Sequence, residues 1–190
     1  MNLYEIRDRV FEGGRLVLSI DQLSNLIPAP KAHAKVYANR MIKKGFATRI
    51  IEGTIAFTND TFIIASQLIE PSYISFTSAL YLQGIIKQIP TVVECVTPKN
   101  SRVFKSPRIE YHKINSELFF GYERMERYGS YVFVARPAKA ILDMIYFDLY
   151  PRLMKIRLDK DEIKKMAKAY EKIGGYRAGR VIKWVMENAR

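Results

Sequence analysis

The sequence contains very little cysteine, with Cys95 alone among its 190 residues. A single thiol excludes a disulfide within the chain and any zinc site built from several cysteines. It lies in the apolar run TVVECVTP, which favours a buried thiol, because no nearby histidine or helix start would stabilise a thiolate. The two histidines, His33 and His112, are far apart and lack metal-ligand spacing. We therefore expect no metal ion and no cofactor.

Long hydrophobic runs are also missing. The longest, such as FIIASQLI at residues 62–69, fall well short of the roughly 20 residues that a membrane-spanning helix needs. The first residues, MNLYEIRDRVFEGG, carry acids and lack the apolar segment of a signal peptide. These absences predict a soluble, cytoplasmic protein without a membrane partner.

The motifs that mark common enzymes are absent too. The sequence has no phosphate-binding GxxxxGKS/T or GxGxxG loop, no HExxH and no GxSxG. We therefore assign no catalytic residue and expect a protein that is not an enzyme. A metal-dependent nuclease is the enzymatic alternative, since Glu94 and Glu110 lie on expected strands with Lys113 near the second. Alternating charges on the solvated face of a sheet explain the same pattern more simply.

What the sequence does have is an excess of positive charge. Lys and Arg number 31 against 19 Asp and Glu, which gives a net charge of +12. An excess of this size favours a polyanionic partner, either nucleic acid or an anionic membrane surface. Residues 151–190 hold twelve basic residues against five acids, whereas residues 1–60 hold nine against six. The C-terminal segment is therefore as much a candidate binding surface as the N-terminal one.

The first sixty residues have the pattern of a small DNA-binding domain. After an expected helix over residues 4–12, Ser19 with Gln22 three residues later forms a capping-box pattern that starts a second helix. A third helix ends at Gly45, and two β-rich runs follow, separated by a Glu-Gly pair that indicates a hairpin turn. Helices and hairpin in this order predict a winged helix-turn-helix domain over residues 1–60.

The third helix of this domain is basic and amphipathic. No acidic residue occurs from Lys31 to Ile51. A helix in the major groove of DNA reads base edges with its exposed face, and Asn and Arg pair well with adenine and guanine. Drawn at roughly 100° per residue, the helix turns Ala34, Tyr37, Ala38 and Met41 inward. We predict base contacts from Lys35, Val36, Asn39 and Arg40, phosphate contacts from Lys31, Lys43, Lys44 and Arg49, a flanking role for His33, and Thr54 at the tip of the wing.

Two other interpretations of this segment stay open. A solvated basic helix beside a hairpin occurs in many ordinary domains. Winged helices also serve as protein-interaction modules without touching DNA. A pure interaction module would respond neither to DNA sequence nor to the loss of single basic residues on the helix.

Residues 61–190 have the pattern of a mixed α/β domain. Two helices are expected first, one over residues 61–70 and one that Ser75 caps and Gly84 ends. Strand patterns follow at 91–97, 108–114, 118–123 and 131–135, then a helix opening with Pro137 and basic helices to the C-terminus. The expected fold class is α+β: a winged helix-turn-helix, then an α/β domain with a small, mostly antiparallel sheet and C-terminal helices.

A basic loop joins the first two of these expected strands. It has four basic residues and no acid. One interpretation is a secondary binding surface that contacts nucleic acid or an acidic protein partner. The other is an ordinary solvated loop. Its basic residues are Lys99, Arg102, Lys105 and Arg108.

Several short motifs in the second half resemble the AbiEi-like family of antitoxins and transcriptional regulators. They are a Ser-x-x-Ser-Ala-Leu helix start, a following Gly, a Val-Thr-Pro turn with basic residues after it, a Phe-Phe-Gly segment and an Ala-x-Pro-x-x-Ala-Ile-Leu-Asp helix. In this sequence they fall at 75–80, Gly84, 96–98 with Lys99 and Arg102, 119–121, and 135–143. The closing segment 166–185 resembles the terminal helix pair of that family, and Arg136 stands where the family usually has Ser.

This resemblance implies a fold and a function. Members of the family have an N-terminal winged helix-turn-helix and a C-terminal α/β domain. It implies an autoregulating repressor that binds double-stranded DNA and counteracts a cognate nucleotidyltransferase-like toxin encoded beside it. A stand-alone regulator without a toxin is equally compatible with these residues, and so are a monomer and a dimer.

Overall fold

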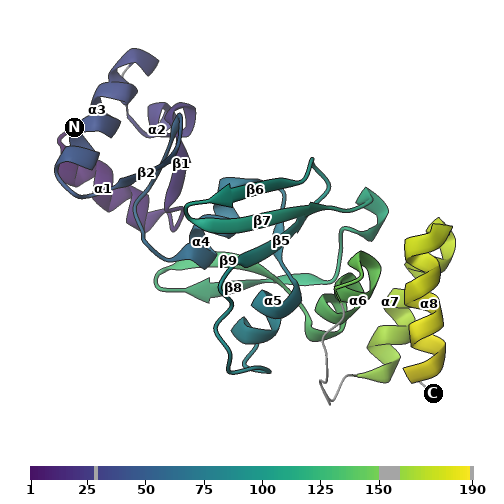
Figure 1. Ribbon diagram of the computed structural model, residues 1–190. Coiled ribbons are helices and arrows are strands. Elements are labelled where there is room, and N and C mark those ends of the chain that lie inside the picture. Colours follow the sequence, from purple (N-terminus) through teal and green to yellow (C-terminus); the bar gives the residue numbers. More distant parts are fainter. Residues whose placement is uncertain (28–29, 150–158, 189–190) are drawn as a thin grey trace.

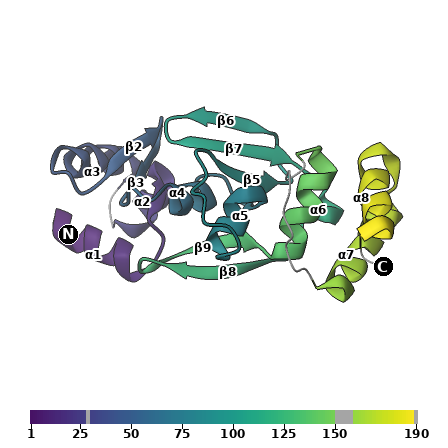
Figure 2. The same cartoon turned by 60° about the horizontal axis from the view of Figure 1, so that its bottom comes forward.

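The computed structural model describes residues 1–27, 30–149 and 159–188. Within these ranges the chain forms eight α-helices and two β-sheets. The expected α+β class is therefore confirmed. Figures 1 and 2 show the N-terminal helices at one end, the larger sheet in the middle, and helices α7 and α8 at the opposite end.

The first sheet is small and is built with three helices from the first 56 residues. Its strands lie in the order β1-β3-β2, and both pairings are antiparallel. Ser19 caps α2 and exchanges hydrogen bonds with Gln22, so the predicted capping box is confirmed. Gly45 follows the third helix with φ of +74°, a conformation that favours glycine. The elements are α1 (Leu3–Glu12), β1 (Val17–Ser19), α2 (Ile20–Leu26), α3 (Lys31–Lys43), β2 (Thr48–Ile51) and β3 (Thr54–Ala56).

The second sheet has six strands in the order β6-β7-β5-β4-β9-β8. The β5–β7 and β4–β9 neighbours are parallel, and the other three pairs are antiparallel. The expectation of a small sheet was therefore wrong in size, whereas most of the pairings, three of five, are antiparallel as expected. The strands are β4 (Tyr73–Ile74), β5 (Val93–Thr97), β6 (Arg102–Lys105), β7 (Arg108–Lys113), β8 (Tyr122–Arg127) and β9 (Ser130–Ala135).

Two segments of this sheet differ from the sequence prediction. The basic loop contains strand β6, an edge strand whose exposed charged side chains gave no alternating apolar pattern. The strand expected at 118–123 begins only at Tyr122, after a short 3-10 helix, η1 (Ser116–Leu118). Gly121, with φ of +75°, breaks the extended run there, and a Cβ on it would lie 3.1 Å from Lys139.

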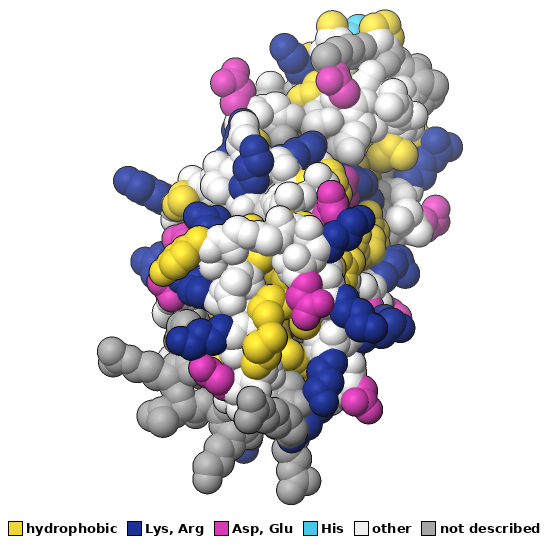
Figure 3. Space-filling model, turned by 90° about the vertical axis from the view of Figure 1, so that its right-hand side faces the viewer, with side chains coloured by type: hydrophobic (Ala, Val, Ile, Leu, Met, Phe, Trp, Pro, Cys, Tyr) yellow, Lys and Arg dark blue, Asp and Glu magenta, His cyan; other side chains and the backbone are white. Residues whose placement is uncertain are grey.

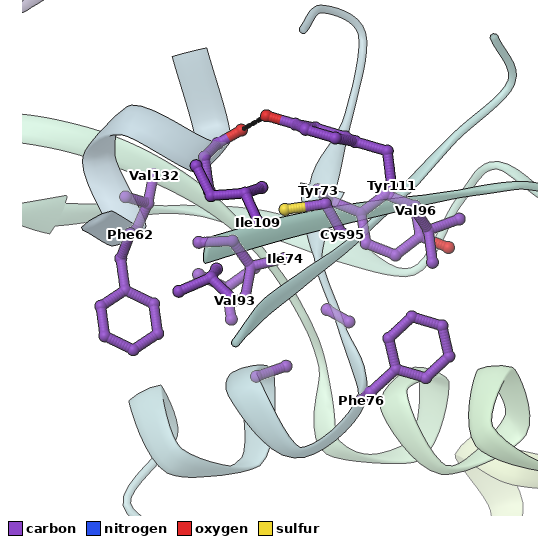
Figure 4. Close-up of a cluster of buried hydrophobic side chains, with 14 of the residues drawn as sticks. Phe62, Tyr73, Ile74, Phe76, Val93, Cys95, Val96, Ile109, Tyr111 and Val132 are labelled. Atoms are coloured by element: carbon purple, nitrogen blue, oxygen red, sulfur yellow. Dashed lines mark hydrogen bonds between the residues drawn. The ribbon is translucent and has the colours of Figure 1, made fainter. Parts of the chain in front are cut away.

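Helices cover both faces of the second sheet. Helix α4 (Thr61–Leu68) lies on one face, where the Tyr111 hydroxyl donates to the Ala65 carbonyl at 2.6 Å. Figure 4 shows this bond, with Cys95 beside it and Phe76 on the opposite face. Cys95 is fully buried, as expected for a structural thiol. The opposite face carries α5 (Phe76–Leu82) and α6 (Pro137–Phe147), and α7 (Lys160–Ile173) and α8 (Gly175–Asn188) pack outside α6.

A buried glutamine links the two sheets. The Gln67 side-chain oxygen accepts from the backbone N–H groups of Leu16 and Val17 at 2.9 and 3.1 Å. Its amide nitrogen donates to the Ser130 hydroxyl and to the Tyr131 carbonyl. One side chain thus satisfies groups from both sides of the expected boundary at residue 60.

Replacing Gln67 with leucine should lower the free energy of unfolding by about 3 kcal/mol. Two backbone N–H groups and one carbonyl lose their partners, and each buried unsatisfied group costs about 1–3 kcal/mol. Urea unfolding followed by circular dichroism measures the loss. The matched control is Gln83→Leu, whose partly exposed amide makes only two 3.3 Å contacts. An equal loss in both variants would show that the hydrogen bonds of Gln67 add no more to the free energy of unfolding than those of Gln83.

Candidate nucleic-acid interface

Helix α3 has the two faces that its sequence predicted. Ala34, Ala38 and Met41 are at most 2% exposed, and they pack toward the other N-terminal helices. Tyr37 and Ile42 are half-buried at the edge of this face. The 3.6-residue spacing of small and apolar side chains explains why this face turns inward.

The opposite face of α3 projects basic residues into solvent. Val36, Arg40 and Lys43 follow one another at helical spacing and form one exposed stripe, with Val36 45% exposed. Lys44 is the C-cap residue and is exposed as well. Cations near a helix C-terminus are favoured by the helix dipole, which helps to explain why the helix carries them there.

A groove separates α3 from the β2–β3 hairpin. Lys35 and Asn39, one turn apart, line it on the helix side, and Arg49 and Thr54 line it on the hairpin side. Its volume is about 200 Å³, and the turn residues Glu52 and Gly53 also line it, so the groove includes one acidic side chain. The structure therefore brings together four of the ten residues predicted from the sequence to bind DNA.

Inside this groove, Arg49 contacts Asn39 directly. The Arg49 Nη2 donates to Asn39 Oδ1 at 2.8 Å. The bond orients the Asn39 side chain and uses one of the two lone pairs on its oxygen. The second lone pair and the NH₂ group therefore stay available to another partner. The sequence assigned Arg49 to phosphate and did not predict this contact, because it depends on how the hairpin folds back over α3.

His33, Lys31 and Thr54 were also among the residues predicted to bind DNA. His33 is exposed on the first turns of α3. The side chain of Lys31 lies outside the described residues. The expectation that Thr54 forms the tip of the wing was wrong. Glu52 and Gly53 form the turn, and Thr54 is half-buried beside the groove.

The predicted secondary basic surface divides into two parts along the β6–β7 hairpin. Lys105 and Arg108 are cross-strand partners at its turn, and this turn lies against the segment that joins β3 to α4. Arg102 pairs with Tyr111 at the other end of β6, on the side of Lys99. All four basic side chains are exposed, but they do not gather into one patch.

Helices α7 and α8 form a further surface of mixed character. Figure 3 shows apolar side chains gathered there between basic and acidic ones. A shallow groove of about 570 Å³ is lined by Ile182 and Met186 of α8, with Lys183 and Glu187 beside them. This end of the molecule is therefore an apolar strip with charged edges rather than a uniformly basic face.

The most deeply buried charges form a polar cluster between the second sheet, α6 and α7. Lys139 and Asp143 of α6 form an ion pair with no solvent exposure. Asp143 also accepts from the hydroxyls of Tyr73 and Ser75, at 3.0 and 2.7 Å, and Lys139 donates to the Tyr170 hydroxyl at 2.9 Å. Ser75 and Asp143 belong to the motifs that carry the AbiEi resemblance, whereas Lys139 was not singled out in the sequence.

Burial governs the chemistry of this cluster. It lowers the pKa of the Lys139 ammonium, and the Asp143 carboxylate opposes that change. It raises the pKa of Tyr73 and of Tyr170 well above the usual tyrosine value, with Asp143 adding to the effect. Since the ion pair has no exposed surface, we interpret the cluster as structural.

Comparison of the chain with models of known protein families gives no match, and comparison with curated proteins gives none either. None of the helices in the described part of the chain combines the length and the apolarity that a bilayer span requires.

Proposed function

We propose that residues 1–60 form a winged helix-turn-helix and that the protein is a sequence-specific, DNA-binding transcriptional regulator without enzymatic activity. In this proposal α2 and α3 are the helix-turn-helix and the β2–β3 hairpin is the wing. The observation that carries it is the exposed basic face of α3, which has no acidic residue and borders a groove formed with the hairpin. An α-helix with such a face fits the major groove of DNA.

Each part of the α3 surface has its own role in this proposal. Val36 and Arg40 on the outer stripe contact base edges, the first a thymine methyl group and the second a guanine. Asn39 contacts adenine, and Arg49 holds its carboxamide in place through the 2.8 Å bond. Lys43 and Lys44, at the C-terminal end of α3, contact phosphates. Such contacts set the orientation of the protein on the duplex.

The second half of the proposal concerns an antitoxin role, which rests on the AbiEi resemblance. The regulator would repress its own gene and counteract a nucleotidyltransferase-like toxin through its C-terminal domain. The apolar strip on α7 and α8, with Lys183 and Glu187 at its edge, is the surface that suits a protein partner. The exposed basic face of α3, at the other end of the molecule, stays available to DNA (Figure 1).

Alanine at Arg40 should weaken binding to the operator by about 1–3 kcal/mol and relax specificity at one base pair. Alanine at Lys44 should weaken binding to all sequences alike and lower the salt slope by about one. Both are measured by fluorescence anisotropy with the DNA upstream of the gene and with scrambled DNA of equal length, across a salt series. Arg124→Ala is the matched control, since that exposed arginine lies on β8, outside the α3 surface.

The binding of the wild-type protein to the two DNAs tests the proposal before any variant is needed. Tighter binding to the upstream DNA that persists at physiological salt supports it. Equal binding to both DNAs that vanishes as salt rises would mean that the net positive charge alone causes binding, and the proposal would fail.

A further inference from the structure

Two glutamates and a histidine meet on neighbouring parallel strands of the second sheet. Glu94 of β5 and Glu110 of β7 are direct cross-strand partners. His112 follows Glu110 by two residues, so its side chain points to the same face of the sheet. One ligand atom from each side chain lies within 4.8 Å of the others. We call Glu94, Glu110 and His112 the triad.

The triad is electrostatically incomplete. Like charges directly opposite each other in a sheet are destabilising, and no described Lys or Arg forms an ion pair with Glu94 or Glu110. The Nε2 atom of the His112 imidazole is 3.7 Å from the Glu94 carboxylate, too far for a hydrogen bond. That Nε2 is buried and has no hydrogen-bond partner among the described residues. A cation between the three side chains would resolve both problems.

The side chains of the triad are held in position by their surroundings. Phe76 and Phe147 pack against the His112 ring, with centroid distances of 5.0 and 5.5 Å. The Thr77 hydroxyl lies 3.4 Å from the second oxygen of Glu94. The side chains of Glu94 and His112 are 22% and 24% exposed, so the cluster lies near the protein surface, although the Nε2 atom itself is buried.

Lys113 is not part of this arrangement. It alternates with His112 along β7 and therefore points to the other face, where its ammonium donates to Asn100. The lysine that a nuclease site would place beside the two acids is therefore separated from them. The triad has the composition of a metal-binding site without that lysine.

We infer that Glu94, Glu110 and His112 bind a divalent transition-metal ion. Two carboxylates and one imidazole suit Zn²⁺, which takes nitrogen and oxygen ligands at about 2 Å, with water completing the shell. Mg²⁺ fits less well, because it prefers an all-oxygen shell. Bound zinc would join β5 to β7 and remove the repulsion between the two glutamates.

Isothermal titration calorimetry of the full chain with zinc chloride tests this inference. We expect one Zn²⁺ per chain, with Mg²⁺ giving no comparable heat. His112→Gln and Glu110→Gln should each weaken zinc binding by at least about tenfold, as loss of a ligand requires. His33→Gln is the matched control: it removes the other histidine, which is exposed on α3, and should leave the affinity unchanged.

Thermal unfolding separates loss of the site from loss of the fold. Without metal, Glu110→Gln should melt at the same temperature as the wild type or higher, because it removes a like-charge contact. Zinc should raise the melting temperature of the wild type by more than it raises that of Glu110→Gln at the same concentration. The inference is overturned if the wild type takes up no zinc, if His112→Gln and Glu110→Gln keep wild-type affinity, or if His33→Gln loses it.

Discussion

Methionine in place of Lys139 should lower the free energy of unfolding by about 3–5 kcal/mol, measured by urea denaturation. The substitution keeps an unbranched side chain of similar length but removes the ammonium that pairs with Asp143, where both partners are fully buried. A buried carboxylate left without its counter-ion is strongly destabilising, and this cost, rather than the worth of the pair, sets the magnitude.

A second variant separates the unpaired charge from simple misfit. In Lys139→Met/Asp143→Leu the charge disappears, and most of the stability should return, because apolar replacements of buried ion pairs are often neutral or stabilising. The hydroxyls of Tyr73 and Ser75 then lose an acceptor, so recovery stays incomplete. Lys168→Met, on the exposed face of α7, should change stability by less than about 0.5 kcal/mol. If the Lys139 single variant matched this control, the buried pair would have no structural role.

The sequence predicted local structure well where local chemistry sets it. The Ser19–Gln22 capping box and the inward face of α3 follow from residues within a few positions of one another. Strand β6 was missed because its hydrogen bonds to β7 hold it at the sheet edge, while its side chains stay in solvent. Periodicity measures side-chain burial, so it carries little information about such a strand.

Long-range contacts were beyond any sequence pattern. Lys139 and Asp143 have the four-residue spacing of an ordinary surface salt bridge, and only the packing of α6 between sheet and outer helices buries them. The triad depends on the parallel register that aligns Glu94 with Glu110. Likewise, the exposed residues of α3 were predictable, but the Arg49–Asn39 bond was not.

Alkaline solution should unfold this protein steeply. Burial raises the pKa of Tyr73, Tyr111 and Tyr170 above the usual value of 10.0. Above pH 10 the unfolded chain therefore loses these protons while the folded chain keeps them. The folded state then binds more protons, so its stability falls as pH rises. Each group contributes about 1.4 kcal/mol per pH unit, and the three together about 4 kcal/mol.

Two other buried groups modify this pH dependence. Burial also raises the pKa of the Cys95 thiol, which adds a loss that begins near pH 9. Lys139 acts in the opposite sense: its lowered pKa makes stability rise with pH, but only up to its unfolded value of 10.5. Above that value its contribution is constant, so the tyrosines and the cysteine dominate. Because domains are stable by about 5–15 kcal/mol, cooperative unfolding should occur within roughly two pH units above 10.

Circular dichroism and tyrosinate absorbance, recorded together across the alkaline range, measure this effect. The three buried tyrosines should ionise only as the helical signal is lost. Tyr111→Phe should reduce the pH slope of the unfolding free energy by about 1.4 kcal/mol per unit, while Tyr176→Phe should leave the slope unchanged. Full ionisation of all tyrosines near pH 10 with the helical signal intact would contradict the burial that holds this core together.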